Sequence, residues 1–420
     1  MHHIRIYENG LTLLTAPLKS TESVTVLILV GAGSRYETKS INGISHYLEH
    51  LFFKGAKRYK TSKEVSSAVD GLGGEMNAFT GKEYAGYYIK IAAKHLEKSI
   101  DILSDMLLHS RFDPAEIDKE RGVILEEYNM YQDTPMYQVL WDFEELIFGD
   151  QPLGWSEVGT KAFIMTAAQS DFRAYKEMLY VPANTVISIA GHVDQKEVED
   201  LIPRYFDVPP SPQGKHFDPY QKLSASSFVS LTNKKTEQAH MVLGVEGFDY
   251  HDDRKYALQV MSVILGGNMS SRLFQKIRDD RGLAYYVQTS SSDYHDTGVF
   301  YTRAGVSLQD LDEVVKVVKG EYELIAQEKV STEELTKAKE YLKGKMILHM
   351  EDSEEVAHFY GRQQLLLGTI ETPKEEMKKI DQVTIDDVLH VSQDLFTRPY
   401  YLSVIGPFED KEHFSALLSA

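Results

Sequence analysis

The stretch that decides how this chain folds and works is His46-Tyr47-Leu48-Glu49-His50. If it is helical, His46 and His50 stand four residues apart and project from one face, close enough to share a metal ion. Neutral imidazoles suit Zn²⁺, and a carboxylate such as Glu49 beside a zinc-bound water can take its proton as the water attacks a carbonyl. The pentad, in the inverted order His-x-x-Glu-His, therefore indicates peptide hydrolysis. The alternative is two surface histidines on an amphipathic helix.

The composition narrows the class of protein. A chain of 420 residues is long for one core and fits two or more domains. It has no cysteine, so a metal site must use histidine and carboxylate ligands. Its net charge of −18 disfavours nucleic acid and anionic membranes as partners, and no apolar run is long enough to span a bilayer. Because the chain opens in a strand-like segment rather than a signal peptide, we expect a cytoplasmic protein.

Strands and amphipathic helices are mixed along the first half of the chain. Residues 4–14 are typical of a hairpin with its turn at Asn9-Gly10, and residues 24–30 alternate like a strand. Helices are expected from Thr61 onward and over residues 95–108, where apolar residues recur at helical spacing. This mixture predicts the α+β class.

A second helix is predicted to begin at Asp113-Pro114 and to carry two inward-facing carboxylates. On a helical wheel Glu120 and Glu127 share one stripe, whereas Glu126 points away from it. A buried carboxylate is costly unless it is paired or binds a metal, so this stripe calls for a cation. Glu127 is then the candidate third ligand beside the two histidines, with the fourth position open. The alternative is that both carboxylates pair with lysine or arginine on a neighbouring helix.

With these two segments in hand, the chain resembles the pitrilysin and insulysin metallopeptidases, and among them the shorter bacterial processing proteases related to mitochondrial processing peptidase. Residues 46–50 resemble the inverted zinc motif of that family, and residues 120–127 resemble the segment that carries its third ligand. The resemblance implies one zinc ion per chain held by His46, His50 and Glu127. It makes Glu49 the general base and Glu120 an acid that orients a ligand histidine.

Two further segments carry the resemblance to the substrate side of the site. Residues 73–80 resemble the edge strand on which family members lay the substrate, which implies that Asn77, Ala78 and Phe79 contact the peptide. Residues 278–285 resemble the segment with an arginine and a tyrosine that reach the scissile carbonyl. Arg278 and Tyr285 are therefore expected to be catalytic, and if that segment is helical they face the same way.

The second half of the chain repeats the pattern of the first. Three prolines and a glycine within residues 208–215 indicate a linker, and we predict a catalytic domain at 1–208, a linker at 209–216 and a repeat domain at 217–420. In this register Leu258, Met261 and Ser262 replace His46, Glu49 and His50, so the second copy lacks metal ligands. The sequence therefore predicts two tandem, structurally similar domains, one active and one inactive.

These observations predict a zinc-dependent endopeptidase or oligopeptidase that cleaves short or unfolded peptides. The resemblance implies that chains pair so that a closed chamber selects such peptides, and that a homodimer partner lends Arg278 and Tyr285 to the site. One alternative is a catalytically silent core or partner subunit of a processing complex, which usually lacks part of the ligand set. Another is a metal-storage or scaffold protein, which leaves the placement of Glu49 unexplained.

Overall fold

The computed structural model describes residues 2–211, 216–222 and 228–419, so residues 212–215 of the predicted linker lie outside the described residues. The chain forms two compact units. The first unit comprises Met1–Tyr128, Trp155–Asp218 and Ile347–Ile370, and the second comprises Asn129–Gly154, Pro219–Met346 and Glu371–Ala420. Within the described ranges, no helix combines the length and the apolar character needed to cross a bilayer.

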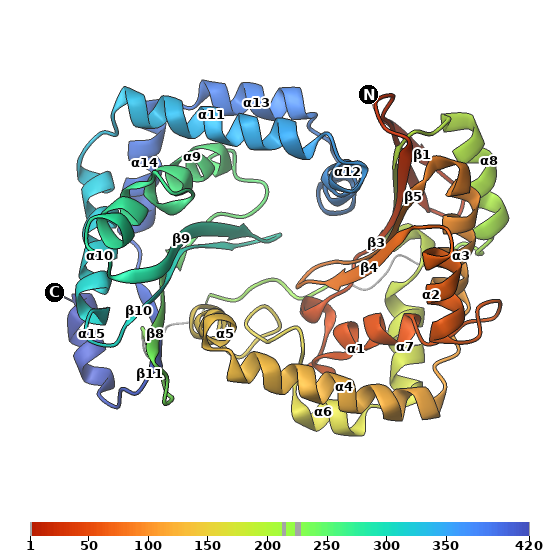
Figure 1. Cartoon of the computed structure of the whole chain (residues 1–420), viewed down its shortest axis with the longest axis horizontal. Coiled ribbons are helices and arrows are strands. Elements are labelled where there is room, and N and C mark those ends of the chain that lie inside the picture. Colours follow the sequence, from red (N-terminus) through yellow and green to blue (C-terminus); the bar gives the residue numbers. More distant parts are fainter. Residues whose placement is uncertain (1, 212–215, 223–227, 420) are drawn as a thin grey trace. The chain divides into compact units, whose positions relative to one another are not determined.

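The first unit is built on a six-stranded sheet in the order β1-β2-β6-β3-β5-β4 (Figure 1). β2 and β6 are parallel and the other neighbours are antiparallel, including the predicted hairpin of β1 and β2. The strands are β1 (His3–Ile6), β2 (Thr12–Pro17), β3 (Ser23–Val30), β4 (Glu75–Thr80), β5 (Ala85–Ala92) and β6 (Thr185–Gly191).

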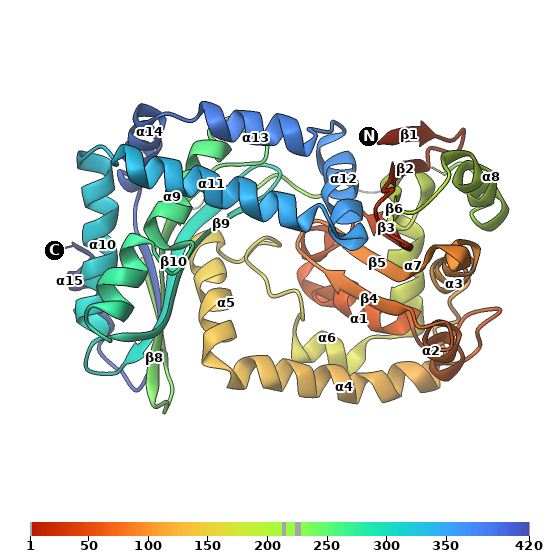
Figure 2. The ribbon, with the colours of Figure 1, turned by 45° about the horizontal axis from the view of Figure 1, so that its top comes forward.

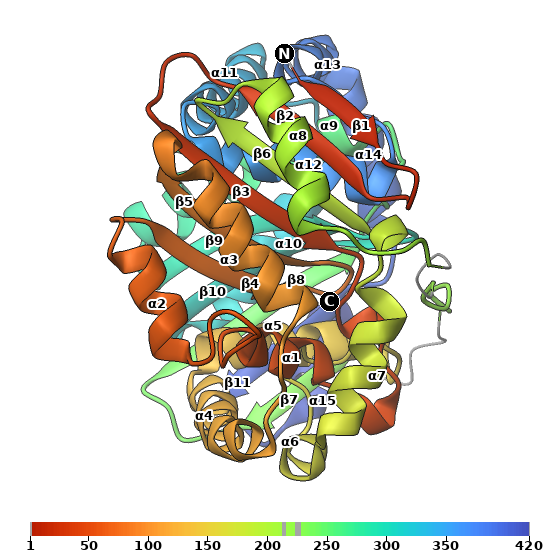
Figure 3. The ribbon, with the colours of Figure 1, turned by 90° about the vertical axis from the view of Figure 1, so that its right-hand side faces the viewer.

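Helices cover both faces of this sheet, so the central strand β3 is apolar on both sides. Leu27 and Leu29 pack against Ala357 and Tyr360 of α12, and the alternate residues of β3 face α3 and its neighbours (Figure 3). The helices of this unit are α1 (Ile44–Phe52), α2 (Ser62–Asp70), α3 (Leu96–Leu108), α4 (Pro114–Asp133) up to residue 128, α6 (Lys161–Thr166), α7 (Gln169–Leu179), α8 (Gln195–Tyr205) and α12 (Ser353–Leu367).

The second unit has a five-stranded sheet in the order β7-β11-β8-β10-β9. α5 packs on one face, where Val139 and Phe143 contact Val242, and α9, α10 and α14 pack on the other. The strands are β7 (Val229–Asn233), β8 (Gln238–Glu246), β9 (Ala284–Asp293), β10 (Gly298–Ser307) and β11 (Tyr401–Gly406). The helices are α5 (Pro135–Phe148), α9 (Lys255–Gly266), a π-helix (Phe274–Asp279), α10 (Leu311–Gln327), α11 (Thr332–His349) up to residue 346, α13 (Pro373–Gln382), α14 (Ile385–Phe396) and α15 (Lys411–Ser419).

The two sheets have the same topology once β1 is set aside. In each, a parallel pair (β2 with β6, β7 with β11) is followed by three strands in antiparallel order. The prediction of an α+β fold with two similar domains is therefore confirmed.

The compact units differ from the predicted ranges 1–208 and 217–420 in two segments. Residues 129–154, with α5, belong to the second unit, and residues 347–370, with α12, belong to the first. Each of these helices covers the open face of the sheet formed by the other half of the chain. The boundary between the units consequently falls inside the long helices α4 and α11.

Candidate metal centre

At the N-terminus of helix α1, the buried carboxylate of Glu37 accepts hydrogen bonds from backbone N–H groups. Gly43 precedes the helix with a φ of 101°, and its N–H and that of Ser45 donate to Glu37 at 2.8 and 2.9 Å. Asn42 adds a third donor to the same carboxylate at 2.9 Å. Helix N-termini leave such donors unpaired and favour negative charge, so Glu37 fixes the start of α1 and with it the position of the histidines.

One face of α1 is buried and the other carries polar groups. Tyr47, Leu48 and Leu51 are buried, and the Tyr47 hydroxyl donates to the carbonyl of Ile117 on α4 at 2.6 Å. This bond links α1 to α4, the long helix along the bottom of the view in Figure 2. His46 lies on the other, polar face of α1, where its Nε2 approaches the carboxylate of Glu127 further along α4.

Helix α4 begins at Pro114 as predicted, and its phase turns two carboxylates toward α1. Ile117, Glu120 and Ile124 are buried on this side, and Glu127 is half-buried. Glu126 is exposed. The helical wheel therefore separated the two neighbouring glutamates as the structure does.

His46, His50 and Glu127 converge. One ligand atom from each lies within 4.8 Å of the others. The Nε2 atoms of His46 and His50 are 3.6 and 3.4 Å from the Glu127 carboxylate oxygens. Ligands at about 2.0–2.1 Å in a tetrahedral zinc site stand about 3.3–3.4 Å apart, so two imidazoles and one carboxylate at these distances fit Zn²⁺ with one position open.

The second nitrogen of His50 is held by an acid and a lysine. His50 Nδ1 lies 2.9 Å from Glu120 Oε1, and Lys54 Nζ lies 2.5 Å from Glu120 Oε2. With Glu120 ionised, the proton of a neutral His50 resides on Nδ1 and the Nε2 lone pair faces Glu127. Glu120 therefore occupies the orienting position that the resemblance implied.

The metal-free site draws protons to histidine and away from the carboxylates. Burial lowers the pKa of His50, but hydrogen bonds to Glu120 and Glu127 outweigh it and raise the pKa to about 9. Hydrogen bonds from His46 and His50 hold the pKa of Glu127 well below its usual range. Burial raises the pKa of Glu120, but hydrogen bonds from His50 and Lys54 outweigh it and lower the pKa. A metal ion can replace the proton in this carboxylate-rich site.

Glu49 lies on the same face of α1 but outside the three-residue group. Its Oε2 accepts a hydrogen bond of 2.5 Å from the hydroxyl of Thr80, the last residue of β4. The carboxylate is thus left out of the ligand set and is tied to the end of the strand predicted to bind substrate.

β4 is an edge strand, as the sequence predicted: β5 is its one sheet neighbour. The N–H of Ala78 donates to the side chain of its own neighbour, Asn77, at 2.9 Å, so it points to the free edge rather than to β5. Phe79 packs against the ring of His358 on α12, with centroids 5.0 Å apart. An extended peptide could therefore add to this edge.

Arg278 and Tyr285 lie in the second unit, on different elements. Arg278 is in the π-helix, with its guanidinium 5.0 Å from the ring centre of Phe274, and Tyr285 is the second residue of the edge strand β9. The condition under which both would face the same way, one helix through both residues, is not met, because the helical segment ends at Asp279 and Gly282 takes a φ of 63° between them. Tyr285 is 66% exposed.

Three residues that support the site were missed from the sequence. Thr80 and Lys54 are distant from their partners Glu49 and Glu120 along the chain, and Glu37 lies several residues before the start of α1, outside any standard capping pattern. Only Lys54 gave a signal, because it follows His50 by four residues.

Comparison with known proteins agrees with this geometry. The family model "Insulinase (Peptidase family M16)" matches residues 13–160, and the model "Peptidase M16 inactive domain" matches residues 167–342. Similar curated proteins include an uncharacterized zinc protease of Streptomyces coelicolor, 36% identical over 96% of this chain and 89% of its own. The uncharacterized zinc protease YmxG of Bacillus subtilis is 35% identical over 95% of this chain and 97% of its own.

Solved structures share the whole fold. A protease from Helicobacter pylori matches with a TM-score of 0.89 at 23% identity, covering 97% of this chain and 99% of that one. A peptidase M16 inactive domain from Pseudomonas fluorescens matches with a TM-score of 0.89 at 15% identity, covering 97% and 98%.

Proposed function

Because the chain belongs to the M16 family of peptidases, we propose that it is a zinc-dependent endopeptidase that cleaves short or unfolded peptides. The observation that carries this proposal is the convergence of His46, His50 and Glu127, with Glu49 on the same face but outside the ligand set. A metal-storage site does not require a carboxylate such as Glu49, which lies beside the three ligands without being one of them. We assign one zinc ion to each chain.

Zinc, when bound, supplies a Lewis acid for the scissile carbonyl and lowers the pKa of water. Glu49 then takes the proton of the attacking water and returns it to the leaving amine. Thr80 orients Glu49 for this transfer, because its hydroxyl occupies one carboxylate oxygen and leaves the other free. Glu120 and Lys54 keep His50 in the tautomer that presents Nε2.

In the proposed complex, substrate lies along β4. The free edge offers the Ala78 N–H once the Asn77 side chain turns away, and the peptide would form main-chain bonds there. Such recognition needs an extended peptide, which favours short or unfolded substrates over folded ones. The same edge strand ends at Thr80, beside the proposed base.

We further propose that two copies pair to enclose a chamber and that each lends Arg278 and Tyr285 to the site of the other. Both residues lie in the second unit, whose described residues include no group of histidines and carboxylates that could hold a metal ion. In this arrangement Tyr285 would stabilise the developing oxyanion. A two-fold homodimer, the commonest assembly, would supply both sites equally.

The competing function is a catalytically silent subunit of a processing complex. Against it stands the complete set of ligands with a separate base. Profiling cleavage of a peptide library, with and without a chelator and with Glu49→Gln as the control, decides between them. We expect cleavage of extended peptides that the chelator abolishes and zinc restores. Zinc binding at one ion per chain without any cleavage would support the silent subunit instead.

A further inference from the structure

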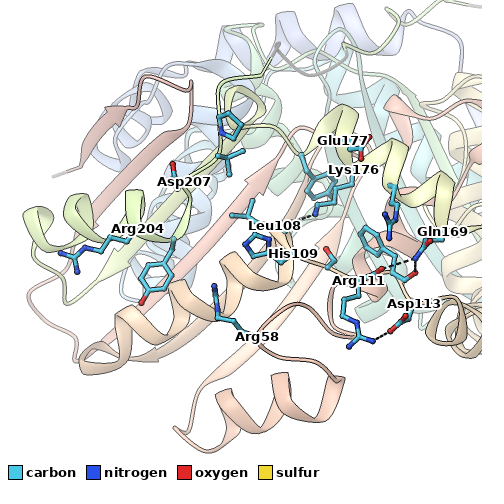
Figure 4. Close-up of a pocket in the computed structure, with 17 residues that line it drawn as sticks. Arg58, Leu108, His109, Arg111, Asp113, Gln169, Lys176, Glu177, Arg204 and Asp207 are labelled. Atoms are coloured by element: carbon cyan, nitrogen blue, oxygen red, sulfur yellow. Dashed lines mark hydrogen bonds and ion pairs between the residues drawn. The ribbon is translucent and has the colours of Figure 1, made fainter.

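A second site of the first unit shares no lining residue with the metal centre. A cavity of about 920 Å³ opens between the C-terminal end of α3, residues 109–113, α7 and residues 204–209 (Figure 4). Its volume lies within the range of about 300–1,000 Å³ that small-molecule sites occupy.

One face of α7 lines this cavity. Gln169, Arg173 and Lys176 follow one another at spacings of four and three residues and therefore form a single stripe, and Tyr180, the residue after the helix, lines the same cavity. The buried side of the helix faces the core with Phe172, Tyr175 and Leu179. The cationic residues of α7 are thus directed to the cavity by the same amphipathic pattern that seats the helix.

The lining is cationic in a chain whose net charge is −18. Five cationic side chains, Arg58, Arg111, Arg173, Lys176 and Arg204, stand against three carboxylates, Asp113, Glu177 and Asp207. Arg58 pairs with Asp101 and Arg111 with Asp113, but within the described part of the chain neither Arg173 nor Arg204 forms an ion pair. Uncompensated positive charge in a concave site attracts anions.

Lys176 is half-buried, and its ammonium group meets a backbone carbonyl instead of a carboxylate. Its Nζ donates to the carbonyl of Leu108, the last residue of α3, at 2.9 Å. Burial lowers the pKa of Lys176 to about 8, opposed by Glu177 and reinforced by the charge of Arg173. An anion beside this ammonium group would relieve the cost of its charge.

The segment 109–113 is held in a strained conformation at the wall of the cavity. Phe112 has a φ of 49° and is the single non-glycine residue with positive φ among the described residues. The amide of Gln169 donates to its carbonyl at 2.8 Å and helps to hold it there. Backbone strain of this kind tends to occur at ligand sites.

The remaining wall is apolar. Phe112 is buried, and Leu108, Tyr180 and Val208 also line an adjoining apolar cavity of about 30 Å³. The site therefore combines a cationic side with an apolar one.

We propose that this cavity binds a small organic phosphate, with its phosphate group at Arg173 and Lys176 and an aromatic body against Phe112 and Tyr180. Guanidinium and ammonium groups together suit a doubly charged phosphate, and aromatic rings prefer to contact one another. This inference does not depend on the peptidase function.

The test uses 1-naphthyl phosphate, a fluorescent compound with both features, and the full zinc-loaded chain. Fluorescence anisotropy measures its Kd for the wild type, for Arg173→Glu/Arg204→Glu and for the control Lys19→Glu/Lys94→Glu. All four residues are exposed, so each variant should fold, and both carry the same change in charge. We expect the first variant to weaken binding at least about tenfold, as the loss of charge-assisted bonds does, and the control to change it less than about twofold.

Competition by inorganic phosphate and by 1-naphthol separates the two halves of the ligand. Each alone should bind at least about tenfold more weakly than 1-naphthyl phosphate, because each makes only part of the contacts. Equal binding by both double variants would overturn the site, because phosphate held at the zinc ion or on the general surface would not distinguish them. Inorganic phosphate that binds as tightly as the naphthyl ester would overturn the aromatic part of the proposal.

Discussion

Helix α1 of the first unit and helix α9 of the second follow matching strands of two sheets with the same topology. Their side chains differ in kind, because α1 carries candidate metal ligands and α9 carries core residues. α1 presents His46 and His50 to Glu127, and all three are partly exposed. In α9 the residues predicted to replace the catalytic set, Leu258, Met261 and Ser262, are buried, in a helix that packs into the core of its unit. The described part of the second unit therefore has the same sheet topology as the first without a group that could hold a metal ion.

The comparison extends to the edge strands. β4 ends at Thr80, whose hydroxyl donates to Glu49, whereas β9 carries the exposed Tyr285 as its second residue. Among the described residues, the first unit holds the groups that fit metal and base chemistry, whereas the second unit exposes Tyr285 and has no such group. The same arrangement of strands and helices therefore occurs both with and without the catalytic set.

The largest effect is expected when the metal-binding face of α1 is made apolar, as the corresponding face of α9 is. The double substitution His46→Leu/His50→Leu should abolish zinc binding and all cleavage, because two of three protein ligands are lost. The fold should survive, since the buried face of α1 is untouched. Zinc content by mass spectrometry and thermal melting by circular dichroism measure the two effects. His95→Leu/His192→Leu is the control and should keep zinc and activity, whereas unfolding of the double variant in α1 would show that the metal holds this unit together.

The next largest effect is expected when the base alone is removed. Glu49→Gln keeps the shape and the hydrogen bond to Thr80 but loses basicity, so kcat should fall at least about a hundredfold. Zinc content should stay at the wild-type level, because Glu49 is outside the ligand set. Peptide cleavage assays and metal analysis on the same preparation give both numbers. A variant that retains wild-type kcat would refute the role of Glu49.

Three glutamates of α4 should contribute to zinc affinity to different degrees. Glu127→Gln should weaken zinc affinity most, because it loses a direct ligand, and Glu120→Gln should weaken it by about 10- to 100-fold, as changes behind a ligand do. Glu126→Gln is the matched control on the exposed side and should leave affinity unchanged. Competition with a zinc indicator dye measures each Kd. If Glu126→Gln proved the weakest binder, the helix phase would be wrong.

A smaller, positive effect tests whether the second unit serves a partner. Glu49→Gln and Tyr285→Phe should each be inactive alone, but subunit exchange should restore up to about a quarter of wild-type activity. Half of randomly mixed dimers are mixed, and each of these has one site with both intact groups. Mass-tagged chains verify the exchange. Proven exchange without recovered activity would place the action of Tyr285 within its own chain or outside the reaction.

The smallest effect concerns the edge strand. Ala78→Pro removes an N–H that faces the free edge, so KM should rise about 3- to 10-fold, the cost of roughly one hydrogen bond, while the melting temperature changes little. Phe79→Pro is the contrast: alternation along the ladder turns the Phe79 N–H toward β5, so it should lower the melting temperature instead. Steady-state kinetics and melting curves separate the two. An unchanged KM in folded Ala78→Pro would exclude this edge from substrate binding.

Local patterns in the sequence predicted most of the elements around the site. The hairpin turn at Asn9-Gly10, the cap at Thr61 and the start of α4 at Pro114 follow from short-range turn and capping chemistry, and the structure has them. The inward phase of Glu120 and Glu127 follows from a period of 3.6 residues alone. The segment 278–285 is not a single helix, because Gly282 adopts a positive φ there, and a glycine just past a helical segment is itself a local signal of the helix end.

The sequence by itself determined the donor set, the duplication and the loss of ligands in the second copy, because residue identity and periodicity are properties of single segments. Tertiary structure alone decided that α5 covers the sheet of the second unit and α12 the sheet of the first. It also decided that Thr80 contacts Glu49, that Lys54 and Glu120 hold His50, and that cationic side chains gather beside α7. These facts join residues far apart in the chain, and packing of apolar faces brings them together. The sequence gives the charge and shape of each side chain. Which other side chains it contacts depends on which apolar faces become buried when the chain folds.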